Sequence, residues 1–313
     1  MSAKPKSLTL NLATLVLLLN LGGASAALIS RELRCEHAEN PLGIDAKRPA
    51  LSWALEAPGR GERQSAYQIL VASSPEGIAA GQGDMWDTGQ VRSSQQTGLV
   101  YAGKPLANRT KYWWKVRTWD GQGQVGPYST PATFETAMLE PADWRAKWVG
   151  GRFNRIRKDL VIAKPIREAR AYVTGLGYFE LHINGEKIGH DVLVPGETKY
   201  RSSNVVLGEN YRALYLTYDI SQQLRAGTNA IGLLLGAGFY NQRRSDPVAK
   251  AICEIWIRHL DGSTAVFGSD ESWKGDTNGP ILFNGVYDGE HYDATREDAW
   301  NTAGFNDSAW TAV

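Results

Sequence analysis

The stretch that decides the fold is Tyr178-Phe-Glu-Leu-His-Ile-Asn-Gly-Glu-Lys-Ile-Gly189. Polar and apolar side chains alternate from Tyr178 to Asn184, which is the period of a strand with one buried face. Asn184 and Gly185 then supply the two central residues of a type I′ turn, where both positions need a positive φ. A short return strand follows the turn. The stretch therefore predicts a β-hairpin.

The sequence on either side of this hairpin predicts further strands and shows no helical periodicity. Strand-like runs occupy residues 170–174, 214–220, 230–235, 251–257 and 264–267, with Asp261-Gly262 as a second turn. Seven or eight antiparallel strands of this kind form a jelly roll, which we expect over residues 151–313. Its predicted core consists of Val173, Leu181, Ile183, Leu216, Ile220, Ile231, Leu233, Ile255 and Ile257.

Residues 27–137 predict a smaller β-sandwich, so the whole chain is expected to be all-β. Evenly spaced strand candidates lie at 51–53, 66–72, 98–101, 111–119 and 133–136. Leu106 with Tyr112 resembles the tyrosine corner of fibronectin type III domains, and Trp53 is placed to fill such a core. Residues 138–150 are the predicted linker, in which Trp144 and Trp148 should pack on the next domain.

The first 26 residues have the pattern of a signal peptide. Lys4 and Lys6 precede an apolar run from Leu8 to Leu21, and Ala24-Ser-Ala26 is a small-residue cleavage site. The alternatives are a buried helix or a membrane anchor, but the run is shorter than the ~20 residues that a spanning helix needs. We expect an exported protein, periplasmic or secreted, with no membrane attachment after cleavage.

Composition excludes some partners and leaves the cysteines open. The net charge is +1, which gives no electrostatic reason to bind nucleic acid. Cys35 and Cys253 are expected in different domains, each as a buried unpaired thiol, although export would permit a disulfide. No cluster with metal-ligand spacing accompanies them.

Several segments that follow the hairpin resemble one family when taken in order. They are residues 217–221, 227–232 and 235–240, then Val286-Tyr-Asp-Gly-Glu-His-Tyr-Asp-Ala294, and finally Trp300 to Trp310. Together they resemble the N-terminal region of bacterial α-L-rhamnosidases of glycoside hydrolase family 78. The resemblance implies a fibronectin type III-like domain and a jelly roll that precede a further sandwich and a catalytic (α/α)6 barrel.

The same resemblance implies that the catalytic glutamates lie in the barrel, which needs long helices that this sequence does not predict. No catalytic residue is therefore named. Asp288 and Glu290 would lie ~7 Å apart on a strand, within the range of an inverting glycosidase pair. Almost any Asp-x-Glu on a strand has this spacing, so we expect a structural role for both.

Two functions remain open from the sequence, with a third possibility that the chain is only a packing scaffold. The first is an accessory region of an exported α-L-rhamnosidase, inactive alone, whose partner would be the missing barrel. The second is a stand-alone module that binds rhamnose-containing glycans or glycosides. Tyr178 and Tyr240 would then stack on the sugar, and Asn184, Glu186 and Asp191 would bind its hydroxyls. No cofactor is required, with Ca²⁺ as an optional ion at the sugar site.

The C-terminal segment is expected to be the least stable part. Because the resemblance implies that it leads to a further domain, Trp300, Phe305 and Trp310 should lack part of their neighbours. An exposed aromatic cluster favours association. We therefore expect residues after about 295 to be the most mobile and the most sensitive to protease.

Overall fold

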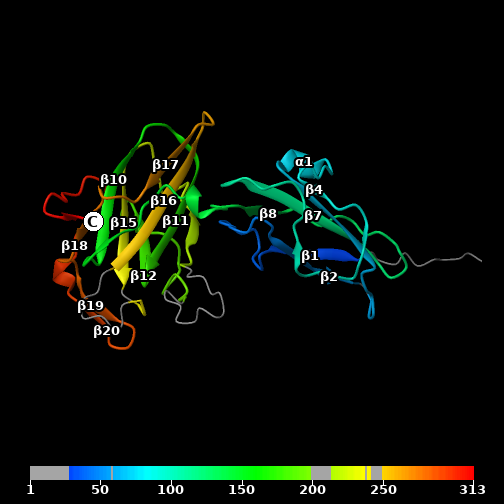
Figure 1. The fold of residues 1–313 in the computed structure, drawn as a ribbon, viewed down its shortest axis with the longest axis horizontal. Coiled ribbons are helices and arrows are strands. Elements are labelled where there is room, and N and C mark those ends of the chain that lie inside the picture. The colour runs from blue at the N-terminus through cyan, green and yellow to red at the C-terminus, as the bar shows by residue number, and fades with distance from the viewer. Residues whose placement is uncertain (1–27, 58, 199–212, 237, 241–248) are drawn as a thin grey trace, which may run out of the picture.

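The computed structural model describes residues 28–57, 59–198, 213–236, 238–240 and 249–313. They form two β-sandwiches that lie next to each other along the long axis of the molecule (Figure 1). α1 (Pro75–Ala79) is the single α-helix of the described residues. The predicted all-β fold is confirmed. No helix in this part of the chain is long and apolar enough to cross a membrane, and the predicted signal peptide lies outside it.

The first sandwich consists of two antiparallel sheets. One contains β1 (Ile29–Cys35), β2 (Ala50–Glu56) and β6 (Leu99–Val100). The other has the order β4 (Trp86–Asp87), β3 (Ala66–Ala72), β7 (Lys111–Trp119) and β8 (Ala132–Glu135), with β5 (Val91–Arg92) also paired to β3. The strands predicted for this domain are present, and β1, β4 and β5 were not predicted.

The core of the first sandwich confirms the two features taken from the sequence. The hydroxyl of Tyr112 accepts a hydrogen bond from the Ala107 N–H at 2.8 Å, which is the contact of a tyrosine corner. Trp53 is buried, and its indole N–H donates to Gln64 Oε1 at 3.1 Å. The ring therefore fills the core without leaving its polar atom unsatisfied.

The second sandwich has a larger pair of antiparallel sheets. One sheet has the order β13 (Glu186–Lys187), β12 (Tyr178–Ile183), β15 (Gly227–Gly236), β10 (Arg155–Ile162), β18 (Lys274–Asp276) and β21 (Thr311–Ala312). The facing sheet has the order β14 (Leu216–Asp219), β11 (Ile166–Leu176), β16 (Ala249–His259) and β17 (Thr264–Gly268), with β9 (Val149–Gly151) on β16. β19 (Ile281–Gly285) and β20 (Gly289–Tyr292) form a separate hairpin.

The hairpin quoted first forms as predicted. Asn184 and Gly185 have φ values of 51° and 95°, and Ile183 pairs with Glu186 across the turn. The predicted core is also confirmed, because eight of its nine side chains are buried and Leu216 is half-buried against them.

Two buried ion pairs join the sandwiches. Arg170 on β11 donates through Nε and Nη2 to the two carboxylate oxygens of Glu135 on β8, at 2.8 and 2.9 Å, and both side chains are 5% exposed. Arg109 of the first sandwich pairs with the fully buried Glu254 of β16. Glu254 also accepts the backbone N–H groups of Arg145 and Ala146 at 2.6 and 2.9 Å.

The predicted linker is a packed segment rather than a free connection. Trp144 lies edge-on against Tyr215, with ring centroids 5.3 Å apart, and also contacts Tyr172. The expectation for Trp148 is wrong, since this side chain is 46% exposed. Directly after it, Val149–Gly151 already pairs with β16. The connection therefore fixes the two sandwiches relative to each other.

The C-terminal segment is anchored, contrary to the expectation that its aromatic side chains lack neighbours. Trp300 is 8% exposed, and its ring lies on β15 so closely that a Cβ at Gly232 would be 2.5 Å from it. Phe305 and Trp310 are half-buried and contact each other, with ring centroids 5.8 Å apart. The backbone of the segment also binds the quoted hairpin, because Asn301 O accepts the N–H of Gly185 at 2.8 Å.

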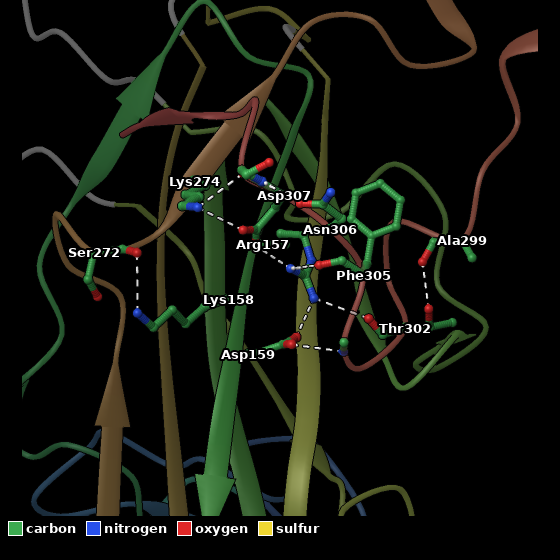
Figure 2. A network of polar contacts seen from close by, with 12 residues as sticks. Arg157, Lys158, Asp159, Ser272, Lys274, Ala299, Thr302, Phe305, Asn306 and Asp307 are labelled. Carbon is green, nitrogen blue, oxygen red and sulfur yellow. Dashed lines mark hydrogen bonds and ion pairs between the residues drawn. The ribbon is translucent and has the colours of Figure 1, made fainter.

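A polar network around Arg157 on β10 holds this segment (Figure 2). The guanidinium is 1% exposed and forms ion pairs with Asp159 and Asp307. It also donates to the carbonyl oxygens of Thr302 at 3.1 Å and Phe305 at 3.4 Å. Both terminal nitrogens of the buried cation therefore have acceptors, as a charge removed from water requires, whereas its Nε has no hydrogen-bond partner among the described residues.

Candidate functional site

The five residues expected to bind sugar do not form one site. Tyr178 pairs with Gly236 at one end of β12, whereas Ile183 pairs with Ile231 at the other end, where Asn184 and Glu186 follow. Five steps of ~3.3 Å along a strand separate the two ends by ~17 Å. The predicted stacking ring of Tyr178 and the predicted polar groups of the turn therefore lie at opposite ends of the sheet.

Of the polar candidates, Asn184 has a structural role in this arrangement. Its amide nitrogen donates to Gln223 O at 2.8 Å and Asn229 Oδ1 at 2.9 Å, and its oxygen accepts the Ala230 N–H at 3.0 Å. The side chain thus ties the turn to the neighbouring loop.

Glu186 and Asp191 remain exposed. Burial, together with the nearby Asp191 carboxylate, raises the pKa of the Tyr218 phenol. No sugar contact is tested by these observations, so sugar binding by the candidate residues stays a prediction.

The opposite end of the second sandwich gathers aromatic and apolar side chains. A Cβ at Gly236 would lie 3.5 Å from Tyr178 Cβ and 3.7 Å from Asn284 Oδ1, so β12, β15 and β19 converge there. The Phe239 ring lies edge-on to Tyr287, with centroids 6.0 Å apart. Tyr240 follows Phe239 directly and is half-buried.

The β19–β20 hairpin presents most of the apolar area at this end. We call its exposed apolar side chains the hairpin surface: Leu282 (52% exposed), Phe283 (42%), Val286 (41%), Tyr287 (80%) and Tyr292 (51%). In Figure 1 this hairpin extends from the lower end of the second sandwich. Large apolar side chains exposed on one hairpin are candidates for an interaction site.

The two carboxylates of the same hairpin lie at its turn and on its second strand. Asp288 lies in the turn and Glu290 on β20, and both are exposed. The structural role expected for both residues stays a prediction.

Neither cysteine is available for chemistry at the surface. Cys35 and Cys253 are buried and unpaired, one in each sandwich, which confirms the expectation from the sequence. Burial raises the pKa of the Cys35 thiol to about 12 and also raises the pKa of Cys253. Both thiols are therefore protonated at neutral pH and poor nucleophiles.

In the parts of the chain that the structure describes, no group of three or more His, Cys, Asp and Glu side chains is placed to hold a metal ion. Ca²⁺ at a sugar site stays a prediction.

The sequence analysis missed the hairpin surface. A signal was present, since residues 281–287 read Ile-Leu-Phe-Asn-Gly-Val-Tyr directly before the Asp288-Gly289 turn. We interpreted this region only through its motif and its carboxylates. This apolar run does not belong to any of the strands predicted for the two large sheets, and that could have indicated an exposed surface.

Two family models match the chain, one for each sandwich. Residues 30–140 match the N-terminal immunoglobulin domain of Rha78A-like proteins, and residues 164–313 match the α-L-rhamnosidase N-terminal domain. Immunoglobulin and fibronectin type III domains share the sandwich architecture, so the first match agrees with the expected fold.

Curated relatives and solved structures agree with these matches. An α-L-rhamnosidase of Formosa agariphila is 34% identical over 87% of this chain and 32% of its own length. The α-L-rhamnosidase structure from Dictyoglumus thermophilum matches with a TM-score of 0.82 and 40% identity, over 91% of this chain and 33% of that one. The Aspergillus terreus enzyme gives a TM-score of 0.77 at 29% identity.

This chain spans about a third of the length of the relatives that it matches. The described residues contain no helical barrel, because their single α-helix has five residues. The matched part contains both sandwiches in the same order. The chain therefore matches, in sequence and in fold, the two N-terminal domains of α-L-rhamnosidases and lacks the rest of their length.

Proposed function

We propose that this chain is the accessory N-terminal region of an exported α-L-rhamnosidase and is inactive on its own. The observation that carries the proposal is the match of both sandwiches, in order, to about a third of enzymes named α-L-rhamnosidases. The rigid connection between the sandwiches suits a structural part of a larger enzyme.

The experiment is a rhamnosidase assay on the purified chain and on a chimera. In the chimera, this chain replaces the matched third of the Formosa agariphila relative. The chain alone should release no aryl alcohol from an aryl α-L-rhamnoside, whereas the chimera should be active. The matched control is the same relative without its N-terminal third. Hydrolysis by the chain alone would overturn the proposal, and so would a folded chimera no more active than the truncated control.

Export is part of the proposal and has its own test. Cleavage after Ala24-Ser-Ala26 should leave a mature protein that begins at Ala27. N-terminal sequencing of the protein recovered from the periplasm or medium checks this. Recovery of uncleaved protein with the membranes would show that the segment is an anchor.

A second candidate function is binding of rhamnose-containing glycans. The observation that favours it is a pair of aromatic rings at one end of the second sandwich, where the 80% exposed Tyr287 lies edge-on to Phe239, the chain neighbour of Tyr240. Exposed aromatic rings can stack on sugars. Titration calorimetry with L-rhamnose, with and without Ca²⁺, tests this function. Heat that disappears in Tyr287→Ser would support it, and no heat in either condition would remove it.

A further inference from the structure

We propose that the outer face of β7 in the first sandwich binds an acidic glycan and that Arg117 holds a carboxylate of this ligand. The inference goes beyond the proposed function and does not depend on it. Even-numbered residues of β7 are buried in the core, so the odd-numbered ones point outward. All the outward side chains are cationic or aromatic: Lys111, Trp113, Lys115, Arg117 and Trp119.

The guanidinium of Arg117 is fixed by its neighbours. It lies over the Tyr128 ring at 4.7 Å and over the Trp119 ring at 5.2 Å, measured to the ring centroids. Its Nε donates to Gln68 Oε1 at 2.9 Å, and the Tyr128 hydroxyl donates to the same oxygen at 3.1 Å. Lys115 steadies Tyr128 in turn, because its Nζ lies 4.7 Å from the centroid of that ring. The plane of the guanidinium is therefore held in one orientation.

The terminal nitrogens of this fixed cation have no protein partner. Nη1 and Nη2 of Arg117 form no hydrogen bond or ion pair with any residue of the described ranges, and neither atom is buried. Arg155 and Arg170, in contrast, use their terminal nitrogens on carboxylates. The paired nitrogens of a guanidinium match the two oxygens of a carboxylate. Because Arg117 is already ordered, binding an anion would cost little side-chain entropy.

The charge on this face also favours an anion. Ala66 pairs with Arg92 on β5 and with Trp119 on β7, so all three lie on the same face of the sheet. Arg92 is exposed and forms no ion pair among the described residues. The acidic group on this side is Asp87, whose Oδ1 already accepts the Gln68 amide at 2.7 Å. The Trp119 ring therefore has an unpaired arginine both along its own strand and across the sheet.

A carboxylated sugar fits this combination better than other anions. Its ring packs flat on an aromatic ring such as Trp119 while its carboxylate reaches the neighbouring guanidinium. An acidic peptide would need pockets for its apolar side chains, but the aliphatic residues beneath this face, Leu70 and Ile78, are 1% and 2% exposed. A nucleic acid is held by many phosphate contacts, and a chain of net charge +1 offers few cations for them.

The probe is an oligogalacturonate, a glycan in which each sugar carries a carboxylate, and its binding to the full chain is measured by titration calorimetry. We expect saturable binding that weakens as the NaCl concentration rises. The methyl-esterified form has the same sugar rings without the charge and should bind about tenfold more weakly. Poly-glutamate supplies carboxylates without sugar rings and should also bind about tenfold more weakly.

Two variants and a control test the residues. Arg117→Lys keeps the charge and removes the fork, so it should weaken oligogalacturonate binding about tenfold. Arg92→Gln changes an exposed side chain and should weaken binding about threefold. The matched control is Arg258→Lys, because Arg258 also lies 5.2 Å from the centroid of a Trp ring but its Nε pairs with Glu168. This control should bind as the wild type does.

Three results would overturn the inference. The first is no binding of oligogalacturonate by the folded wild-type chain. The second is equal binding of the methyl ester or of poly-glutamate, which would assign the face to uncharged sugars or to an acidic protein. The third is wild-type affinity in folded Arg117→Lys or, if that variant does not fold, in Arg92→Gln. None of these results bears on the rhamnosidase activity of the chimera, so the accessory function is tested separately.

Discussion

The ion pair between Glu135 and Arg170 gives the sharpest test of how the two sandwiches are joined. Arg170→Met removes the only side chain that hydrogen-bonds the Glu135 carboxylate among the described residues. Because Glu135 is 5% exposed, water does not replace the lost donors. Removing one partner of a buried pair costs about 3–5 kcal/mol. We expect the free energy of unfolding to fall by about this amount.

The structure also predicts an asymmetry between the two partners. In Glu135→Leu, Arg170 keeps Asp219 at 3.1 Å and the Ala169 carbonyl at 3.0 Å. Its charge therefore remains partly compensated, and the loss should be about 1–3 kcal/mol. The double variant should be more stable than Arg170→Met, because it leaves no unpaired carboxylate in the interface.

The assay is urea unfolding followed by tryptophan fluorescence and circular dichroism. Arg31→Met is the control, since its partner Glu56 is 56% exposed and such surface pairs contribute about 0–1 kcal/mol. Arg170→Met should also separate the unfolding of the two sandwiches into two transitions. If it unfolds at the same urea concentration as Arg31→Met, the interface does not depend on this pair and the reasoning is refuted.

Three further predictions concern single groups. The two cysteines should not react with a thiol reagent in the native protein and should both react in urea; reaction before unfolding would contradict their burial. The Glu180 carboxylate lies 3.6 Å from His182 Nε2 and 2.6 Å from Lys187 Nζ, and these two groups lower its pKa to about 2. The stabilisation that this carboxylate provides is present above pH 4.5 and is lost as the pH falls towards 2. The urea midpoint of Glu180→Gln should therefore change less with pH over that range than the midpoint of the wild type. An equal change in both proteins would contradict the prediction. Gly232→Val should displace Trp300 and expose the C-terminal segment to limited proteolysis, whereas the wild-type segment should resist; equal digestion of both would show that this contact is not needed.

Local pattern was sufficient for most strands of the fold. The alternation from Tyr178 to Asn184 and the turn that follows needed only neighbouring residues to be recognised. β10 was missed because its sequence, Arg-Ile-Arg-Lys-Asp-Leu-Val-Ile, has four charged residues in eight. Its buried Arg155 and Arg157 are compensated by Asp298 and Asp307, about 140 to 150 residues further along the chain. A sequence window does not contain such a partner.

The same limit explains the outcome for the candidate sites. Residue type suggested Tyr178 and Asn184 as parts of one sugar site, but strand length places them at opposite ends of β12. Trp144 and Trp148 are equivalent in composition, yet Trp144 reaches Tyr215 and Trp148 faces solvent. Which of two similar side chains is buried depends on the direction in which the backbone leaves the first sandwich, and this is a tertiary property.

β11 connects two places that have been described separately. The strand carries Arg170 at the contact with the first sandwich and ends at Leu176, two residues before Tyr178 at the far end of the second sandwich. Six steps of a strand measure ~20 Å. The distance between the inter-sandwich contact at Arg170 and the end of the second sandwich at Tyr178 is thus fixed by the length of one extended strand. Spin labels placed at the two ends should give a single narrow distance, and whatever binds the hairpin is held at a constant separation from the first sandwich.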